Sequence, residues 1–189
     1  MRIVEGDVLA LPLADIVTEP WATVVANLPY NIATPVLFRL LELRRRFPRA
    51  VVMLQREMAA RLAARPATAQ YGVPSVLLQA FADIRIVFGV SRRSFVPRPD
   101  VDSAVVDIRW RAGPRVEVGD VDRFREVVRA AFGQRRKMLR NALAGLAKRH
   151  ACAAEDVLGA AGIAPTARAE TLDLEAFARL ARAFARATP

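Results

Sequence analysis

The sequence of 189 residues has little of what builds several common kinds of site. It contains one cysteine, Cys152, and one histidine, His150. A single cysteine excludes a disulfide framework and any cysteine-rich zinc site, so no metal centre is expected. No run approaches the roughly 20 apolar residues that a membrane-spanning helix needs. The opening stretch carries Glu5 and Asp7 in place of the basic and then apolar regions of a secretory signal, so we expect a cytoplasmic protein.

Acidic residues are scarce relative to basic ones, with 19 Asp and Glu against 29 Lys and Arg and a formal net charge of +10. A surplus of this size favours polyanionic partners, above all nucleic acid, over an anionic membrane surface. All the basic residues except Lys137 and Lys148 are arginine. A compositional bias of the genome is therefore an alternative explanation for the positive charge. Charge by itself leaves these two explanations open.

The first part of the chain, up to about residue 114, alternates between strand-like and helix-like segments. Apolar and β-branched runs indicate strands, and apolar residues at helical spacing indicate helices, the first of them capped by Thr34. Such alternation is typical of βαβ units and a mainly parallel sheet, in which the last two strands can form an antiparallel hairpin at one edge. The expected strands span residues 21–26, 50–54, 84–90 and 103–110, and the expected helices span residues 34–46, 55–64 and 73–82.

After a linker at Arg111–Gly119 the strand pattern stops, and only helices are expected. A basic cluster, Arg135-Arg136-Lys137 with Arg140, is predicted to open the second of them. Cations are unfavourable at a helix N-terminus, so contact with phosphates is the natural role for the cluster, with a solvated helix face as the alternative. The expected helices span residues 121–131, 136–147, 154–160 and 174–187.

The segment Val24–Ala33 (VVANLPYNIA) has the clearest chemical content. A predicted strand, buried on both faces, ends at Ala26, and open α/β proteins bind ligands at the carboxyl edge of a parallel sheet. Pro29 has no N–H and keeps Leu28 extended, so the Leu28 carbonyl can point into a cleft beside the Asn27 side chain. Tyr30 adds a flat aromatic face.

Two acceptors beside an aromatic ring suit the methylation of an exocyclic amine on a nucleic-acid base. This amine is a weak nucleophile, because its lone pair is delocalised into the ring. Acceptors aimed at its N–H bonds localise the lone pair and stabilise the positive charge that develops on transfer. Stacking on an aromatic side chain holds the base with about 1–3 kcal/mol. A plain turn at the end of a strand is the alternative, since Asn and Pro are common turn residues.

Several further segments accompany NLPYNIA, and together they resemble the ribosomal RNA adenine N6,N6-dimethyltransferases, the KsgA/RsmA family. The resemblance runs from about Ile3 to Phe184. It implies an α/β fold: a Rossmann-like class I methyltransferase domain, N-terminally incomplete, over residues 1–114, followed by a small all-α RNA-binding domain over residues 119–189. The segments, in the family's order, are 5–9 (EGDVL), 52–79 (VMLQREMAARLAARPATAQYGVPSVLLQ), 94–106 (SFVPRPDVDSAVV), 132–143 (FGQRRKMLRNAL) and 167–172 (ARAETL).

The resemblance implies that S-adenosylmethionine donates methyl groups to N6 of adenines in 16S ribosomal RNA. The product would be N6,N6-dimethyladenine, made by a monomer on the immature small ribosomal subunit during ribosome biogenesis. Asp7 would accept a hydrogen bond from the adenine amine of the cofactor, with Val8 behind the adenine ring. Asn27, which also lies near the methionine end of the cofactor, would bind the target N6 together with the Leu28 carbonyl in the catalytic Asn27-Leu28-Pro29-Tyr30 segment.

The remaining roles that the resemblance implies concern the RNA. Tyr30 would stack on the target adenine, and Phe95 would close over it from the opposite side. The four residues of the basic cluster, Arg135, Arg136, Lys137 and Arg140, would contact the RNA backbone.

The sequence departs from the family at its start, where no Gly-rich turn for the methionine moiety of the cofactor is found. At about 30 residues per βαβ unit, two or three missing units amount to roughly 60–90 residues. We therefore expect a chain that corresponds to the C-terminal two thirds of a family member, with exposed apolar sheet edges. We also expect it to bind S-adenosylmethionine weakly or not at all when alone.

Two alternatives remain open. One is a non-catalytic relative that binds RNA or DNA or assists ribosome assembly. The other is an adenine methyltransferase for another RNA or DNA, because the resistance methylases of the large ribosomal subunit share the Asn-x-Pro-Tyr core. The segment FGQRRKMLRNAL favours the small-subunit family.

Overall fold

The computed structural model describes residues 2–134 and 136–187, and the chain forms two compact units. The first unit comprises Met1–Ala63 and Phe81–Gly113, and the second comprises Ala64–Ala80 and Pro114–Pro189. Residues 64–80 therefore leave the first unit and pack with helices that follow much later in the chain. The sequence predicts a helix within this stretch, but it does not indicate to which unit the helix belongs.

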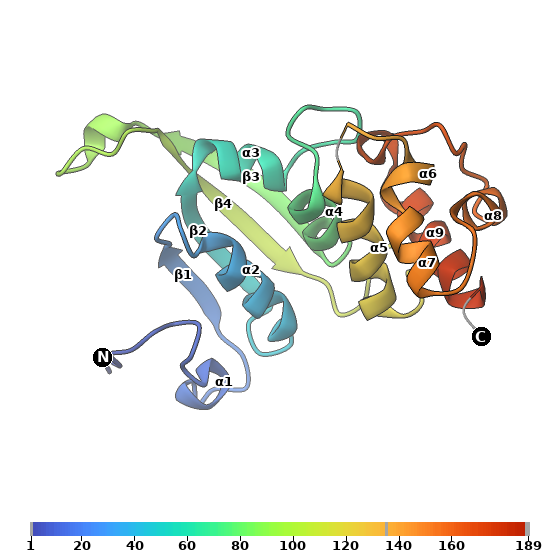
Figure 1. Ribbon diagram of the computed structural model, residues 1–189. Coiled ribbons are helices and arrows are strands. Elements are labelled where there is room, and N and C mark those ends of the chain that lie inside the picture. The colour runs from blue at the N-terminus through green and yellow to red at the C-terminus, as the bar shows by residue number, and fades with distance from the viewer. Residues whose placement is uncertain (1, 135, 188–189) are drawn as a thin grey trace. The chain divides into compact units, whose positions relative to one another are not determined.

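A four-stranded sheet in the order β1-β2-β4-β3 forms the first unit (Figure 1). β1 (Thr23–Asn27) runs parallel to β2 (Arg49–Gln55), whereas β4 (Ser103–Trp110) is antiparallel to both β2 and β3 (Ala82–Val90). The antiparallel hairpin expected at the sheet edge is confirmed. The sheet is less parallel than expected, because β4 lies between β2 and β3 and makes two of the three pairings among the described strands.

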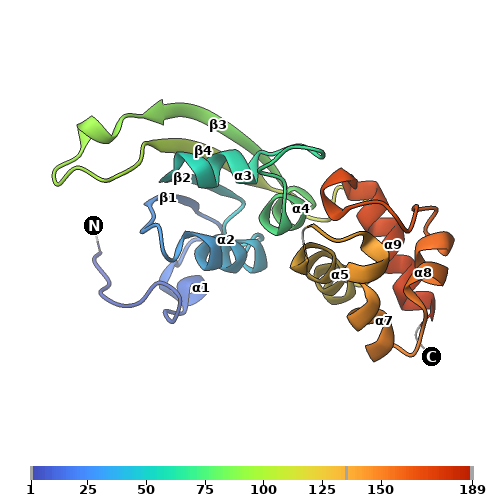
Figure 2. The ribbon, with the colours of Figure 1, turned by 45° about the horizontal axis from the view of Figure 1, so that its top comes forward.

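Two helices of this unit, α2 (Ala33–Glu42) and α3 (Arg56–Leu62), bury apolar residues. They lie on the same face of the sheet (Figures 1 and 2). The unit also contains the short helix α1 (Leu13–Ile16) and, between β3 and β4, the 3-10 turn η1 (Arg92–Ser94). The expectation for α2 needs correction at both ends. The helix begins at Ala33 and ends at Glu42, and Thr34 does not cap it; the Thr34 hydroxyl lies 3.9 Å from Met58 Sδ.

The strand β1 is not buried on both faces as predicted. Its residues alternate between exposed and half-buried, and the Val25 side chain is 78% exposed. The alternation shows that one face of β1 is covered and the other is not, because α2 and α3 both lie on the same face of the sheet. β1 also lies at an edge of the sheet with no second partner among the described strands, so the exposed edge that we expected is observed there.

The second unit is helical, and aromatic rings fill its centre. The Phe132 ring stacks on Phe177 at 5.7 Å between centroids and meets the edge of Tyr71 at 6.0 Å, while Phe124 and Phe184 are fully buried. Within residues 2–134 and 136–187, no helix has the length and apolar character needed to cross a bilayer. The elements are α4 (Val73–Gln79), α5 (Val121–Gly133), α6 (Leu139–Ala142), α7 (Ala144–Arg149), α8 (Ala154–Ala160), the 3-10 turn η2 (Ala169–Thr171) and α9 (Leu174–Ala187).

One predicted helix of this unit, over residues 136–147, is in fact two short helices. Met138 has an extended backbone and precedes the first residue of α6, Leu139, and a break at Leu143 separates α6 from α7. The helix therefore begins after Arg136 and Lys137, so these two cations do not lie at a helix N-terminus.

A buried carboxylate ties two strands of the sheet together. Asp107 on β4 is 4% exposed and accepts a hydrogen bond from Arg49 Nε on β2 at 2.8 Å, with Arg109 Nε 3.3 Å away. The hydrogen bond from Arg49 is the main cause that lowers the pKa of Asp107 below its ordinary value, against a smaller opposing effect of burial.

We expect this ion pair to make stability pH-dependent in the acid range. Because the folded pKa of Asp107 is depressed, its contribution is fully present above the ordinary carboxyl pKa of about 4 and is lost as the pH falls through the lower folded value. Asp107→Asn should therefore reduce the free energy of unfolding at pH 7 and flatten its decline below pH 4. Urea titrations at several pH values measure this, and an unchanged acid limb in the variant would contradict the role.

Candidate active site and RNA-binding residues

The segment Asn27–Tyr30 forms a turn between β1 and α2. The Leu28 side chain is buried, and its N–H donates to the Met53 carbonyl at 3.3 Å, which fixes the end of the strand. The Ile32 N–H then donates to the Pro29 carbonyl at 3.2 Å, and α2 follows. Within the described part of the chain, the exposed Asn27 amide and the Leu28 carbonyl accept no hydrogen bond. The turn thus offers two neighbouring acceptors that the fold itself does not use.

Tyr30 is held in place from a distant part of the sequence. Its hydroxyl lies 3.0 Å from Ser103 Oγ, and its side chain is 38% exposed. Ser103 begins β4 and is 1% exposed, between its pairing partners Gln55 on β2 and Val90 on β3. The ring of Tyr30 therefore has one fixed end and an accessible surface. Sequence reasoning did not single out Ser103, although it is the last residue of the FVPRPDVDS pattern.

Phe95 lies in the loop that joins β3 to β4. Asp102 Oδ1 accepts the Arg92 N–H at 3.0 Å, and Arg92 Nη1 donates to the Asp100 carbonyl at 2.9 Å, so the base of the loop is fixed. The Phe95 side chain is half-buried and, among the described residues, makes no ring contact with Tyr30. The structure does not bring these two rings together, and it links Tyr30 to the end of the loop only through Ser103.

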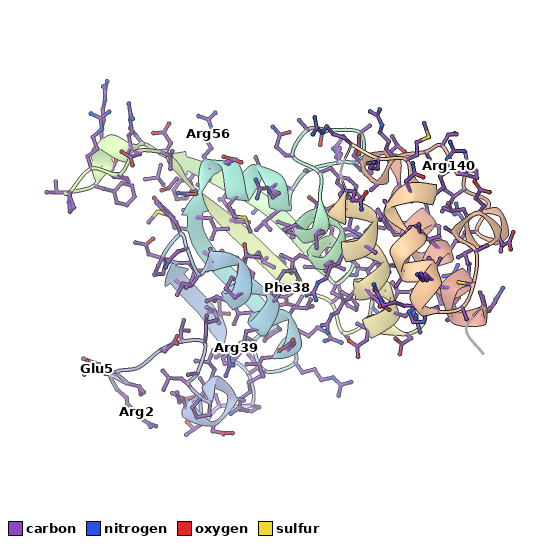
Figure 3. All side chains as sticks on the ribbon, in the orientation of Figure 1. Arg2, Glu5, Phe38, Arg39, Arg56 and Arg140 are labelled. Atoms are coloured by element: carbon purple, nitrogen blue, oxygen red, sulfur yellow. The ribbon has the colours of Figure 1, made fainter. Side chains whose placement is uncertain are left out.

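Asp7 lies in a turn and not at the end of a strand, because residues 2–6 form none. Its Oδ1 accepts the Leu9 N–H at 2.8 Å, the carboxylate is exposed, and Val8 is half-buried. Arg39 on α2 fastens the same turn by donating to the carbonyls of Leu9 at 2.7 Å and Leu11 at 2.5 Å (Figure 3). No sequence signal points to this role of Arg39, since an arginine on an amphipathic helix is usually solvated.

The basic cluster lies between α5 and α6. Arg135 is outside the described residues. Arg136 and Lys137 are exposed in the turn, and Arg140, labelled in Figure 3, is exposed on α6 with its Nη1 3.9 Å from Glu155 Oε1. We predicted that the cluster opens a helix. Among its described members this is correct only for Arg140, which lies in the first turn of α6, and wrong for Arg136 and Lys137. No group of three or more His, Cys, Asp or Glu residues within the described part of the chain is placed to hold a metal ion.

The chain is similar to known proteins along nearly its whole length. Residues 2–185 match the family described as ribosomal RNA adenine dimethylase. The chain is 49% identical over 187 residues to the ribosomal RNA small subunit methyltransferase A of Geobacter sulfurreducens, covering 96% of this chain and 67% of that protein. It is 45% identical over 183 residues to the protein of the same name from Rhodospirillum rubrum, covering 97% of this chain and 61% of that protein. The chain thus spans about two thirds of the length of these relatives.

Solved structures give the same picture. A dimethyladenosine transferase from Plasmodium falciparum superimposes with a TM-score of 0.78 and 25% identity, covering 97% of this chain and 72% of that one. The 23S rRNA methyltransferase ErmE superimposes with a TM-score of 0.63 and 25% identity, covering 96% of this chain and 71% of that one.

Proposed function

Because this chain belongs to the ribosomal RNA adenine dimethylase family, we propose that it methylates N6 of adenines in the 16S ribosomal RNA of the immature small subunit, with S-adenosylmethionine as the methyl donor. The family, the Rossmann-like α/β fold class and the enzyme class, an rRNA adenine methyltransferase, were predicted from the sequence and are confirmed by the family match and the relatives. The proposal further includes the donor, the immature subunit, a monomeric state, a cytoplasmic location, and the division into a methyltransferase domain (1–114) and an RNA-binding domain (119–189).

The observation that carries the proposed mechanism is the pair of unused acceptors at Asn27 and Leu28 beside a fixed Tyr30. Asn27 Oδ1 and the Leu28 carbonyl accept hydrogen bonds from the two N–H groups of the target amine and thereby localise its lone pair. They would also stabilise the positive charge that develops on the nitrogen as the new N–C bond forms and the methyl–sulfur bond of the donor breaks, which would leave the donor as a neutral thioether. The proton then leaves to solvent, and no strong base is needed, because the amine becomes acidic only after alkylation. Tyr30 holds the adenine by stacking.

The residues present fit part of a site for S-adenosylmethionine, which when bound supplies an electrophilic methyl group. Asp7 Oδ1 accepts a hydrogen bond from the Leu9 N–H, and the carboxylate is exposed. Asp7 Oδ2 can therefore accept a hydrogen bond from the adenine amine of the cofactor while Val8 packs behind the adenine ring. Because the sequence contains no Gly-rich turn for the methionine moiety of the cofactor, we expect the chain to bind S-adenosylmethionine weakly. Calorimetry on residues 1–189 measures it, and a micromolar dissociation constant would contradict this expectation.

The proposed function is tested on both ribosomal subunits side by side. Unmethylated small and large subunits are incubated with the chain at donor concentrations above its measured dissociation constant, and adenine nucleosides are then quantified by mass spectrometry. Dimethyladenine in the small subunit alone supports the proposal. Methylation of the large subunit alone would assign the chain to the other methylase class, and RNA binding without any methyl transfer would make it a non-catalytic relative.

The contact between Tyr30 and Ser103 predicts a coupled pair of variants. Tyr30→Phe keeps the ring but removes the hydroxyl, and Ser103→Ala removes its partner. Each should raise KM for RNA about 3- to 10-fold, as expected for one hydrogen bond of about 0.5–1.5 kcal/mol, with little change in kcat. Because both changes remove the same contact, the double variant should be no worse than either single one. Steady-state kinetics of the four proteins measure this, and additive effects would rule out the coupling.

A further inference from the structure

A groove of about 900 Å³ opens on the helical unit, among the end of α7, α8 and the part of α9 from Arg179 onward. It shares no residue with the basic cluster between α5 and α6. The floor is apolar, with Val157, Ala160 and Ala183 among its residues, and the sole cysteine of the chain, Cys152, lies in its wall. Four cations line the groove against one carboxylate, namely Lys148, Arg179, Arg182 and Arg186 against Asp156.

Three of these cations come from a single face of α9. Arg179, Arg182 and Arg186 follow one another at intervals of three and four residues, which places them on the same side of a helix. The opposite side is fully buried, with Phe177 and Phe184 in the core. From the first to the last cation the helix rises about 10 Å. The row therefore extends along the groove and is too long to serve one small ion.

Most of this charge is not neutralised by the fold. The side chains of Lys148 and Arg186 make no hydrogen bond or ion pair within the part of the chain that the structure describes, and both residues are exposed. Arg179 donates through Nε to the Ala161 carbonyl at 3.1 Å, which leaves its two terminal nitrogens available. Only Arg182 is committed, through the Glu117 carbonyl and Glu175, whose Oε1 is 3.5 Å from Arg182 Nη2. Concentrated, uncompensated positive charge in a concave surface attracts a polyanion.

We propose that the α7–α8–α9 groove binds the sugar–phosphate backbone of the ribosomal RNA, at a second contact separate from the basic cluster. The inference rests on the proposed function, which supplies RNA as the substrate. Guanidinium groups bind phosphate oxygens with two parallel hydrogen bonds, which suits a groove lined by three arginines. Contacts of this kind fix the orientation of the RNA without reading its sequence.

The first test measures salt dependence with a matched pair of variants. Arg179→Gln/Arg186→Gln removes two groove cations, and Arg65→Gln/Arg129→Gln removes two exposed cations of the same unit that do not line the groove. Removing one cation that binds a phosphate lowers the slope of log K against log salt by about 1. Filter binding of 16S ribosomal RNA should thus show a slope smaller by about 2 for the groove variant and an affinity at least about 10-fold weaker, with a nearly unchanged control. Equal behaviour of the two variants would overturn the proposal.

The second test uses Cys152 as a reporter inside the groove. As the only cysteine, and a half-buried one, it can be alkylated selectively, and the rate is followed by mass spectrometry. RNA should slow the alkylation of the wild-type chain and not that of Arg179→Gln/Arg186→Gln. Protection by polyglutamate but not by RNA would assign the groove to an acidic protein and overturn the proposal. Failure of the wild-type chain to bind RNA at all would instead count against the proposed function, so the two failures are distinguishable.

Discussion

Replacing Asn27 by alanine should lower the rate of methyl transfer about 10²- to 10³-fold, which is the cost of removing one preorganised group that stabilises developing charge. The Asn27 side chain lies at the exposed end of β1, where it makes no hydrogen bond within the described residues, so its loss leaves no buried partner unsatisfied. The variant should therefore fold normally and bind RNA as the wild type does. The effect belongs to the chemical step, and kcat should fall while KM for RNA stays within about twofold.

The measurement is single-turnover methyl transfer to small subunits, at donor concentrations above the dissociation constant of each variant. Gln70→Ala removes another exposed amide, in the helical unit and outside the proposed site, and serves as the control with an unchanged rate. A loss of RNA affinity that equals the loss of rate would show that Asn27 only binds substrate. An unchanged rate would show that the two acceptors do not act on the amine.

The candidate site was predictable from sequence to the extent that its parts are local. The order Asn27-Leu28-Pro29-Tyr30 already carries the argument about two acceptors and a ring, because a strand end followed by proline constrains the backbone through neighbouring residues. The contact of Tyr30 with Ser103 spans 73 positions, and no local rule selects that partner. Arg39 illustrates the same limit, since the carbonyls that it holds lie 28 and 30 positions away.

For the fold, too, the features set by neighbouring residues were predictable and those set by distant contacts were not. The bounds of β4 and α9 were predicted correctly, because a run of apolar and β-branched residues and a continuous amphipathic pattern are each visible within one element. The burial of β1 was predicted wrongly, since a run of apolar residues does not tell whether helices cover both faces of a strand. The membership of residues 64–80 in the helical unit is likewise a matter of tertiary packing.

Phe177→Ala should destabilise the helical unit by about 3–5 kcal/mol, the usual cost of removing a fully buried aromatic ring. Phe177 has 0% exposure and stacks on Phe132, which in turn meets Tyr71. A loss of this size is a large part of the roughly 5–15 kcal/mol by which most domains are stable. Chemical denaturation measures it, with Phe88→Ala as a control of the same chemistry on β3, where the residue is 56% exposed and a much smaller change, below about 1 kcal/mol, is expected.

The same variant tests whether residues 64–80 fold with the helical unit. Tyr71 precedes α4 and belongs to the aromatic chain that Phe177 completes, so the amides of α4 should lose protection from hydrogen exchange together with those of α5 and α9. The amides of β2 and β4 belong to the other unit, and they should exchange at nearly the wild-type rate. If α4 stayed protected while α5 and α9 opened, the segment would draw its stability from elsewhere and the packing around Tyr71 would be incidental.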